Sequence, residues 1–150
     1  MMEEEARKKA EASSICPPVG QQDMGSKTWG ENLAGRPGWQ VLSAVGSGLA
    51  AQHAAAQRFP DSKQHNDEAD AYRHALWNIK MTRAMSPQSA ADFANSYEVS
   101  GQDPPAEHRM DLYNNAVGRA MATDPRFSKM SAQELAYLAY RNNCFQVRSK

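Results

Sequence analysis

The segment from Asp67 to Met85 constrains the fold most, because its pattern is that of an α-helix with apolar side chains on almost every side. Only Lys80, Arg73 and Arg83 require contact with solvent on the helical projection. A helix that is apolar nearly all round is normally covered by neighbouring elements on several sides. We therefore expect this segment to be the central helix of a bundle.

A polar stripe runs through the middle of this apolar surface. Asp70, His74 and Asn78 follow one another at four-residue steps, which places them within about 80° of one another on a helix. A buried polar group without a partner costs about 1–3 kcal/mol, and a charged group costs more. We therefore expect the stripe to meet polar partners in the core or to line a cleft.

Capping residues and prolines divide the rest of the chain into further helices. Asn66 is the expected N-cap of the central helix, and Ser86-Pro87 and Ser131 mark later helix starts. The expected helices span residues 37–58, 67–85, 87–97, 105–122 and 131–141. No segment shows the alternation that predicts a strand. The chain is therefore predicted to be all-α, a single compact bundle of five or six helices.

The N-terminal segment differs in composition from this bundle. Residues 1–36 are expected to form a charged helix at 2–13 followed by an irregular arm that is rich in glycine, proline, serine and glutamine. Residues 37–150 are expected to form the all-α domain. Within residues 37–58, Gly46, Gly48 and Ala50 predict close packing against neighbours. Insertion of this helix into a membrane is the alternative, although Gln52 and His53 interrupt the apolar run.

Charge and cysteine content limit the function classes. The chain of 150 residues has 17 basic and 17 acidic side chains, so it lacks the overall basic character of a nucleic-acid-binding protein. Cys16 and Cys144 are expected to be unpaired thiols, with a disulfide as the alternative in an oxidising compartment. The first residues contain no apolar core of a cleavable signal peptide, so secretion would use another route.

A second polar stripe is predicted on the helix at 105–122. Glu107, Asp111, Asn114 and Gly118 lie along one border of its apolar face. If this helix packs against the central one, the two stripes face each other, and Glu98 enters from the connecting loop. The result would be a pocket that holds an imidazole, several carboxylates and two or three amides.

Three interpretations of this pocket remain open. In the first, His74 is a general base oriented by Asp70 or Asp111, with Glu98 or Glu107 as the acid. In the second, His74 and Glu98, Glu107 or Asp111 bind zinc, manganese or iron. In the third, the polar network only fixes helix packing. His53, His65 and His108 are expected to be exposed.

Two motifs stand out, DAYRHALW from Asp70 to Trp77 and HRMDLYNNAVGR from His108 to Arg119. Together they resemble an uncharacterised bacterial domain found at the C-terminal ends of polymorphic toxins, such as Rhs-type proteins, and in small secreted proteins. The similarity covers about residues 66–121. Its polar positions are Asp70, Arg73, His74, Glu98, Asp111, Asn114, Asn115 and Arg119. Where that family tends to show His-Glu, this chain has Tyr97-Glu98, which weakens the metal interpretation.

The resemblance implies an antibacterial effector, and we expect a hydrolase that acts on peptidoglycan or lipid in the cell envelope. His74, Asp70, Glu98 and Asp111 are the expected catalytic residues. The expected substrate-binding residues are Arg73, Asn78, Asn114, Asn115 and Arg119. A divalent metal ion is a possible cofactor. A cognate immunity protein and a carrier from a secretion machine are the expected partners, and no nucleic acid is expected. The alternatives are a non-enzymatic membrane-disrupting toxin and a structural or binding protein.

Overall fold

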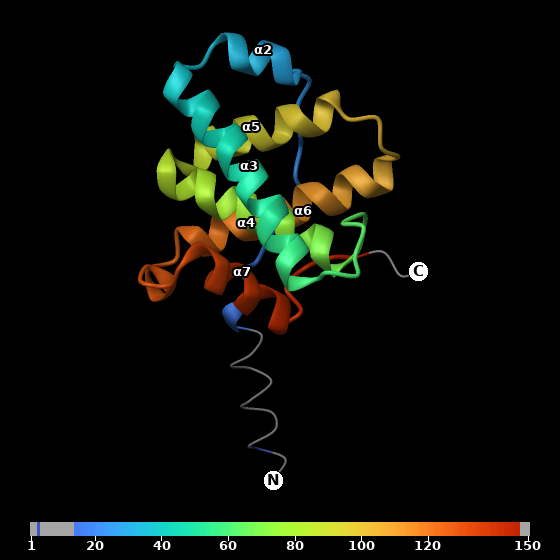
Figure 1. Ribbon diagram of the computed structural model, residues 1–150, viewed down its shortest axis with the longest axis vertical. Helices are drawn as coiled ribbons and strands as arrows, with labels where there is room; N and C mark the ends of the chain where they lie inside the picture. The colour runs from blue at the N-terminus through green and yellow to red at the C-terminus, as the bar shows by residue number, and fades with distance from the viewer. Residues whose placement is uncertain (1–2, 4–13, 148–150) are drawn as a thin grey trace.

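The computed structural model describes residue 3 and residues 14–147, and within them the chain is all-helical, with no strand (Figure 1). The α-helices are α2 (Trp29–Ala34), α3 (Gly38–Arg58), α4 (Glu68–Ala84), α5 (Pro87–Ser100), α6 (Pro105–Ala122) and α7 (Ala132–Arg141), and a 3-10 helix spans Pro125–Phe127. The predicted fold class is confirmed. Apart from Glu3, the charged helix expected at residues 2–13 lies outside the described residues.

Helix α4 is the centre of the bundle. It packs against α3, α5, α6 and α7, and Figure 1 shows these helices surrounding it. Leu76, Ile79 and Met81 of α4 have no exposed surface, and Tyr72 is 2% exposed. Because this helix is covered on several sides, its polar stripe is enclosed in the molecule as well.

Helices α4 and α6 approach each other closely at Gly118. A Cβ atom on Gly118 would lie 2.4 Å from the backbone oxygen of Ala75. Real Cβ atoms essentially never come so close, so the position accepts only glycine without a shift of the backbone. This contact brings the polar side chains of the preceding turns of α6, those of Asp111 and Asn115, against α4.

The helix boundaries agree with the capping signals, with two corrections. Asp67, and not Asn66, caps α4, because its side chain accepts a hydrogen bond from the backbone N–H of Asp70. Asn66 instead has a positive φ of 60° in the turn before the cap. Helix α5 continues to Ser100, so Glu98 lies in its last turn and not in a connecting loop.

The irregular arm contains one helix that the sequence analysis missed. Thr28 accepts a hydrogen bond from the backbone N–H of Glu31, and the Glu31 side chain accepts one from the Thr28 backbone, so the two form a capping box for α2. The helix places Trp29 against Phe93 and Tyr97 of α5, with ring centroids 5.9 Å apart in both pairs. The arm therefore contributes to the wall of the bundle.

Cys16 and Cys144 form a disulfide, so the expectation of two unpaired thiols is wrong. Their separation of 128 residues gave no local signal, because only the packed bundle brings the arm and the segment after α7 together. The disulfide closes nearly the whole described chain into a loop.

Helix α3 packs through alanines, not through most of the small residues that we expected. Its buried residues are Ala44, Ala51, Ala54 and Ala55. A Cβ on Gly48 would lie 3.4 Å from Nε1 of Trp77, whereas a Cβ on Gly46 would meet nothing within 4 Å and Ala50 is exposed.

The outer face of α3 carries exposed apolar side chains. Leu42 is 76% exposed, Leu49 63%, Trp39 57% and Val45 45%. In the described part of the chain, no helix combines the length and the apolarity of a membrane span.

Candidate functional site

The two polar stripes meet at His74. Its Nε2 atom lies 3.5 Å from Oδ1 of Asp70 on the same helix and 3.5 Å from Oδ1 of Asp111 on α6. All three residues are buried, with 3–5% of their surface exposed. The imidazole is therefore flanked by two carboxylates in the core between α4 and α6, as the facing stripes predicted.

A chain of hydrogen bonds behind the imidazole fixes which nitrogen carries the proton. Arg119, which can only donate, donates to Oδ1 of Asn78 at 2.7 Å. The amide nitrogen of Asn78 then donates to Oδ1 of Asn115 at 2.9 Å and to the backbone oxygen of His74 at 2.8 Å. Because Oδ1 of Asn115 is an acceptor, Nδ1 of His74, 3.0 Å away, donates to it. In the neutral imidazole the lone pair is therefore on Nε2, facing Asp70 and Asp111.

Asn78, Asn115 and Arg119, which form this chain of hydrogen bonds, were predicted to bind substrate. The structure places them behind the imidazole. Asn78 and Asn115 have no exposed surface, and Arg119 is 9% exposed. Burial lowers the pKa of Arg119 to about 10, so its guanidinium remains charged at neutral pH. These three side chains form the hydrogen-bond chain that orients the His74 imidazole.

Asp111 has a buried carboxylate oxygen that is not satisfied by a hydrogen bond. Its Oδ1 atom is buried and has no hydrogen-bond partner. Burial raises the pKa of the Asp111 carboxyl to about 7, His74 opposes this shift, and the charges of Glu98 and Asp70 add to it. Asp70 is better paired, because it accepts hydrogen bonds from the backbone N–H of Asn66 and from the Arg73 side chain.

Glu98 and His108 form a second cluster near the first. Nδ1 of His108 lies 3.0 Å from Oε1 of Glu98, and a carboxylate oxygen of Asp103 lies within 4.8 Å of their ligand atoms. Burial raises the pKa of Glu98, while the contact with His108 opposes this shift. The His108 side chain is only 12% exposed, so the expectation of a solvated histidine is wrong. Because α5 is longer than predicted, its last turn brings Glu98 over α6, and this turn covers His108.

Two other predicted site residues have partners elsewhere. Glu107 accepts a hydrogen bond from the Asn66 side chain and lies 3.8 Å from Nε2 of His65. Asn114 exchanges two hydrogen bonds of 2.8 Å with the backbone of Gln146. It therefore fastens the segment after α7 to α6, and its hydrogen bonds are made there and not to His74.

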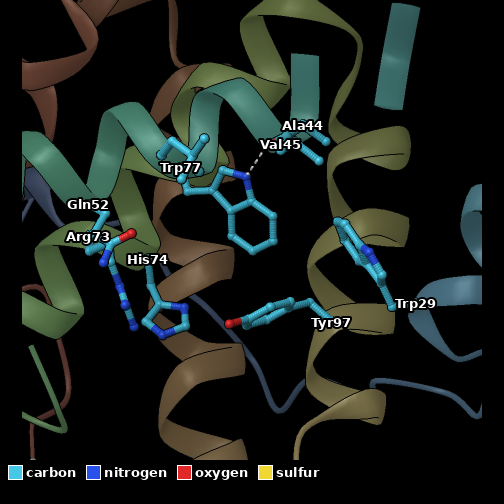
Figure 2. Close-up of a pocket in the computed structure, with 10 residues that line it drawn as sticks. Trp29, Ala44, Val45, Gln52, Arg73, His74, Trp77 and Tyr97 are labelled. Carbon is cyan, nitrogen blue, oxygen red and sulfur yellow. Dashed lines mark hydrogen bonds between the residues drawn. The ribbon is translucent and has the colours of Figure 1, made fainter. Parts of the chain in front are cut away.

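A cleft of about 240 Å³ opens beside His74 (Figure 2). It is lined by Trp29, Ala44, Val45, Gly48, Leu49, Gln52, Arg73, His74, Trp77 and Tyr97. Figure 2 shows Arg73, His74 and Gln52 at one end, Trp29 at the other, and the Tyr97 hydroxyl directed toward the imidazole. The cleft therefore has a polar end at the His74 cluster and apolar walls elsewhere.

The aromatic residues of this cleft were not among the predicted site residues. Trp77 contacts Tyr97 edge-to-face with centroids 5.5 Å apart, and its indole N–H donates to the backbone oxygen of Ala44 at 2.9 Å. Trp77 follows His74 by three residues, so it belongs to the same sector of α4. That spacing was the available signal. Nothing local in the sequence reveals that Trp29 of the arm and Tyr97 of α5 reach the same cleft.

Comparison with known proteins gives a family and no named relative. No curated protein and no solved structure matches the chain. A family model described as a domain of unknown function, DUF6973, matches residues 33–143, which include α3 to α7 and the whole His74 cluster. This match covers most of the chain, and we conclude that the protein belongs to the DUF6973 family.

Proposed function

We propose that this protein is a small antibacterial effector that hydrolyses a lipid of the bacterial cell envelope. The observation that carries the proposal is that a buried imidazole, flanked by two carboxylates, forms one end of a largely apolar cleft. The lone pair of His74 and the carboxylates of Asp70 and Asp111 can accept the proton of an attacking water, or hold a cation that acidifies this water.

The lining of the cleft favours a lipid over peptidoglycan. Trp29, Val45, Leu49 and Trp77 offer apolar surface, and burial of an acyl chain against such surface contributes about 0.8 kcal/mol per methylene group. Sugar hydroxyls and peptide amides would lose hydrogen bonds with water there. Arg73 at the polar end, with 29% of its side chain exposed, suits an anionic headgroup.

Two further observations support a role outside the cytoplasm. A disulfide such as Cys16–Cys144 persists in oxidising compartments, and the two motifs that contain His74 and Asp111 resemble toxin C-terminal domains. An effector of this kind has a carrier in a secretion machine and a cognate immunity protein, and both are part of the proposal. The balanced charge is consistent with a target other than nucleic acid.

The test is periplasmic production of three variants in a sensitive host: wild type, His74→Ala and His53→Ala. His53 is exposed and outside the cleft, so its variant is the matched control. We expect growth arrest with release of fatty acids or lysolipids from wild type and the control, and neither from His74→Ala. Equal toxicity of a folded His74→Ala variant would contradict a catalytic role. Digestion of purified sacculi, with lipids intact, would identify peptidoglycan as the substrate.

The exposed apolar face of α3 favours a second candidate function, disruption of membranes without chemistry. Leu42 is 76% exposed and does not line the cleft. Under this alternative, depolarisation of the host membrane would survive His74→Ala and disappear in Leu42→Glu. Under the hydrolase proposal, Leu42→Glu retains hydrolysis of a detergent-dispersed lipid.

A further inference from the structure

We propose that Asp70, His74 and Asp111 form a binding site for a divalent transition-metal ion of the zinc or manganese class. One ligand atom from each of the three buried residues lies within 4.8 Å of the others. The inference rests on the proposed function in one respect, because the ion would activate the water that the hydrolase uses.

The distances suit a coordination sphere better than hydrogen bonds. Nε2 of His74 is 3.5 Å from Oδ1 of Asp70 and 3.5 Å from Oδ1 of Asp111, whereas hydrogen bonds between nitrogen and oxygen are normally 2.7–3.2 Å long. Ligand atoms about 2.1 Å from a tetrahedral zinc ion are about 3.4 Å from one another. Both separations therefore match an edge of such a tetrahedron.

The orientation of the imidazole is that of a metal ligand. A histidine that binds a metal almost always donates its other ring N–H to a fixed acceptor, which sets the tautomer. Here Nδ1 donates to Oδ1 of Asn115, and Asn78 and Arg119 fix that oxygen as the acceptor. The Nε2 lone pair is thereby directed at the two carboxylates, where a proton donor or a cation is required.

A buried, unpartnered oxygen points independently to a cation. Asp111 is 5% exposed, and its Oδ1, the atom that faces Nε2 of His74, has no hydrogen-bond partner. Arg73 contacts Asp70, whereas among the described residues no arginine or lysine side chain forms an ion pair with this oxygen of Asp111. Two neighbouring carboxylates and a neutral imidazole are expensive to bury, and a divalent ion would satisfy all three groups.

The donor set indicates the class of ion and its role. One imidazole nitrogen with two carboxylate oxygens suits zinc, manganese or iron(II) more than calcium, which takes six to eight oxygen ligands. Three protein ligands leave a fourth position for water, as in catalytic zinc sites, where the bound water ionises near neutral pH. When the ion is bound, His74 is a ligand, and the ion activates the water.

The neighbouring cluster of Glu98, Asp103 and His108 offers an internal control. It also brings three ligand atoms within 4.8 Å of one another. Its buried groups satisfy each other, however, because His108 and Glu98 are within hydrogen-bond distance at 3.0 Å, and Asp103 is exposed. We therefore place the ion at His74 and not at His108.

The test measures metal binding by the full-length protein after removal of metals with a chelator. Zn²⁺ and Mn²⁺ are titrated separately by calorimetry, and bound metal is counted by mass spectrometry. We expect one ion per chain in wild type and in His108→Ala. We expect an affinity at least about 100-fold weaker in Asp111→Asn, because loss of a ligand should exceed the effect of losing a supporting residue.

Asp111→Asn keeps the shape of the side chain and removes a buried charge, so it is expected to fold even if His74→Ala does not. Circular dichroism of each variant confirms the fold. Binding that survives Asp111→Asn, binding lost in His108→Ala alone, or no binding by wild type below millimolar concentration would each overturn the site. Lipid hydrolysis by the chelated protein would contradict the activation of water by a metal ion, but it would support the proposed hydrolase function. Stoichiometric binding without hydrolysis would retain the metal site and contradict the function.

Discussion

At the scale of single residues, the site depends on the orientation of the His74 imidazole. The direction of every hydrogen bond behind His74 follows from Arg119, which has no acceptor, through Asn78 and Asn115 to Nδ1. Three buried side chains thus determine which nitrogen of His74 carries the proton.

Asn115→Ala should remove the acceptor of His74 Nδ1 and leave two buried N–H groups without a partner. We expect a loss of about 1–3 kcal/mol in the free energy of unfolding, because such groups pay their desolvation without compensation. Denaturation in urea measures this loss. Asn115→Asp keeps an acceptor oxygen, so NMR of the imidazole nitrogens should still show the proton on Nδ1 in that variant and a changed tautomer in Asn115→Ala. The same tautomer in both variants would contradict the role of Asn115.

The Asp111 carboxyl predicts a pH dependence of stability in the metal-free protein. It faces His74 and Asp70 of α4, Glu98 of α5 and Asp103, and burial raises its pKa from 3.8 to about 7. Between these pH values the folded state binds more protons than the unfolded state, so stability falls as pH rises from about 4 to 7.

Chelated wild type should therefore unfold at a higher urea concentration at pH 5 than at pH 8, with a smaller difference in Asp111→Asn. Addition of Zn²⁺ at pH 8 should restore the loss in wild type. Identical pH profiles of the two proteins would show that Asp111 does not carry this shift.

At the scale of elements, the contact of α4 with α6 depends on Gly118. Gly118→Ala places a methyl group 2.4 Å from the Ala75 backbone oxygen, and backbone cannot yield as a flexible side chain does. We expect a destabilisation of about 1–3 kcal/mol or more by thermal or urea denaturation. The matched control is Gly46→Ala on α3, where a Cβ meets nothing within 4 Å. This control should be neutral or more stable by up to about 1 kcal/mol. An equal response at both glycines would contradict the close contact.

Local sequence signals predicted most of the helices, and the errors in the predicted helices have local causes too. The bounds of α6 and α7 follow from Pro105 and Ser131, because a proline or a cap acts within one turn. The α2 helix has an equally clear signal in Thr28 and Glu31, but the glycine-rich composition around it outweighed that signal in the sequence analysis.

The candidate site was predictable only in part. His74 and Asp111 lie on regular helices, so their spacing gave the correct facing sides. His108 was misplaced because its cover, the last turn of α5, extends beyond the predicted end of that helix. The cleft could not be predicted, since its walls come from three separate helices and from the arm.

At the scale of the whole molecule, the disulfide fastens the arm to the end of the bundle. Cys16→Ser with Cys144→Ser should lower the free energy of unfolding by about 2–5 kcal/mol, because the unfolded chain regains the freedom of a long loop. Scanning calorimetry of wild type with and without reductant should show the same decrease. The melting temperature of the double variant should not respond to reductant. A wild-type protein that is also indifferent to reductant would show that the bridge contributes little.

The aromatic walls of the cleft have a practical consequence. The chain has three tryptophans, and Trp29 and Trp77 both border the cleft and both contact Tyr97 edge-to-face. Any molecule that enters displaces water from both indole rings, so its arrival should shift their ultraviolet emission. The protein therefore carries an intrinsic optical reporter, with which a library of amphiphiles can be screened without a label or an assay of turnover.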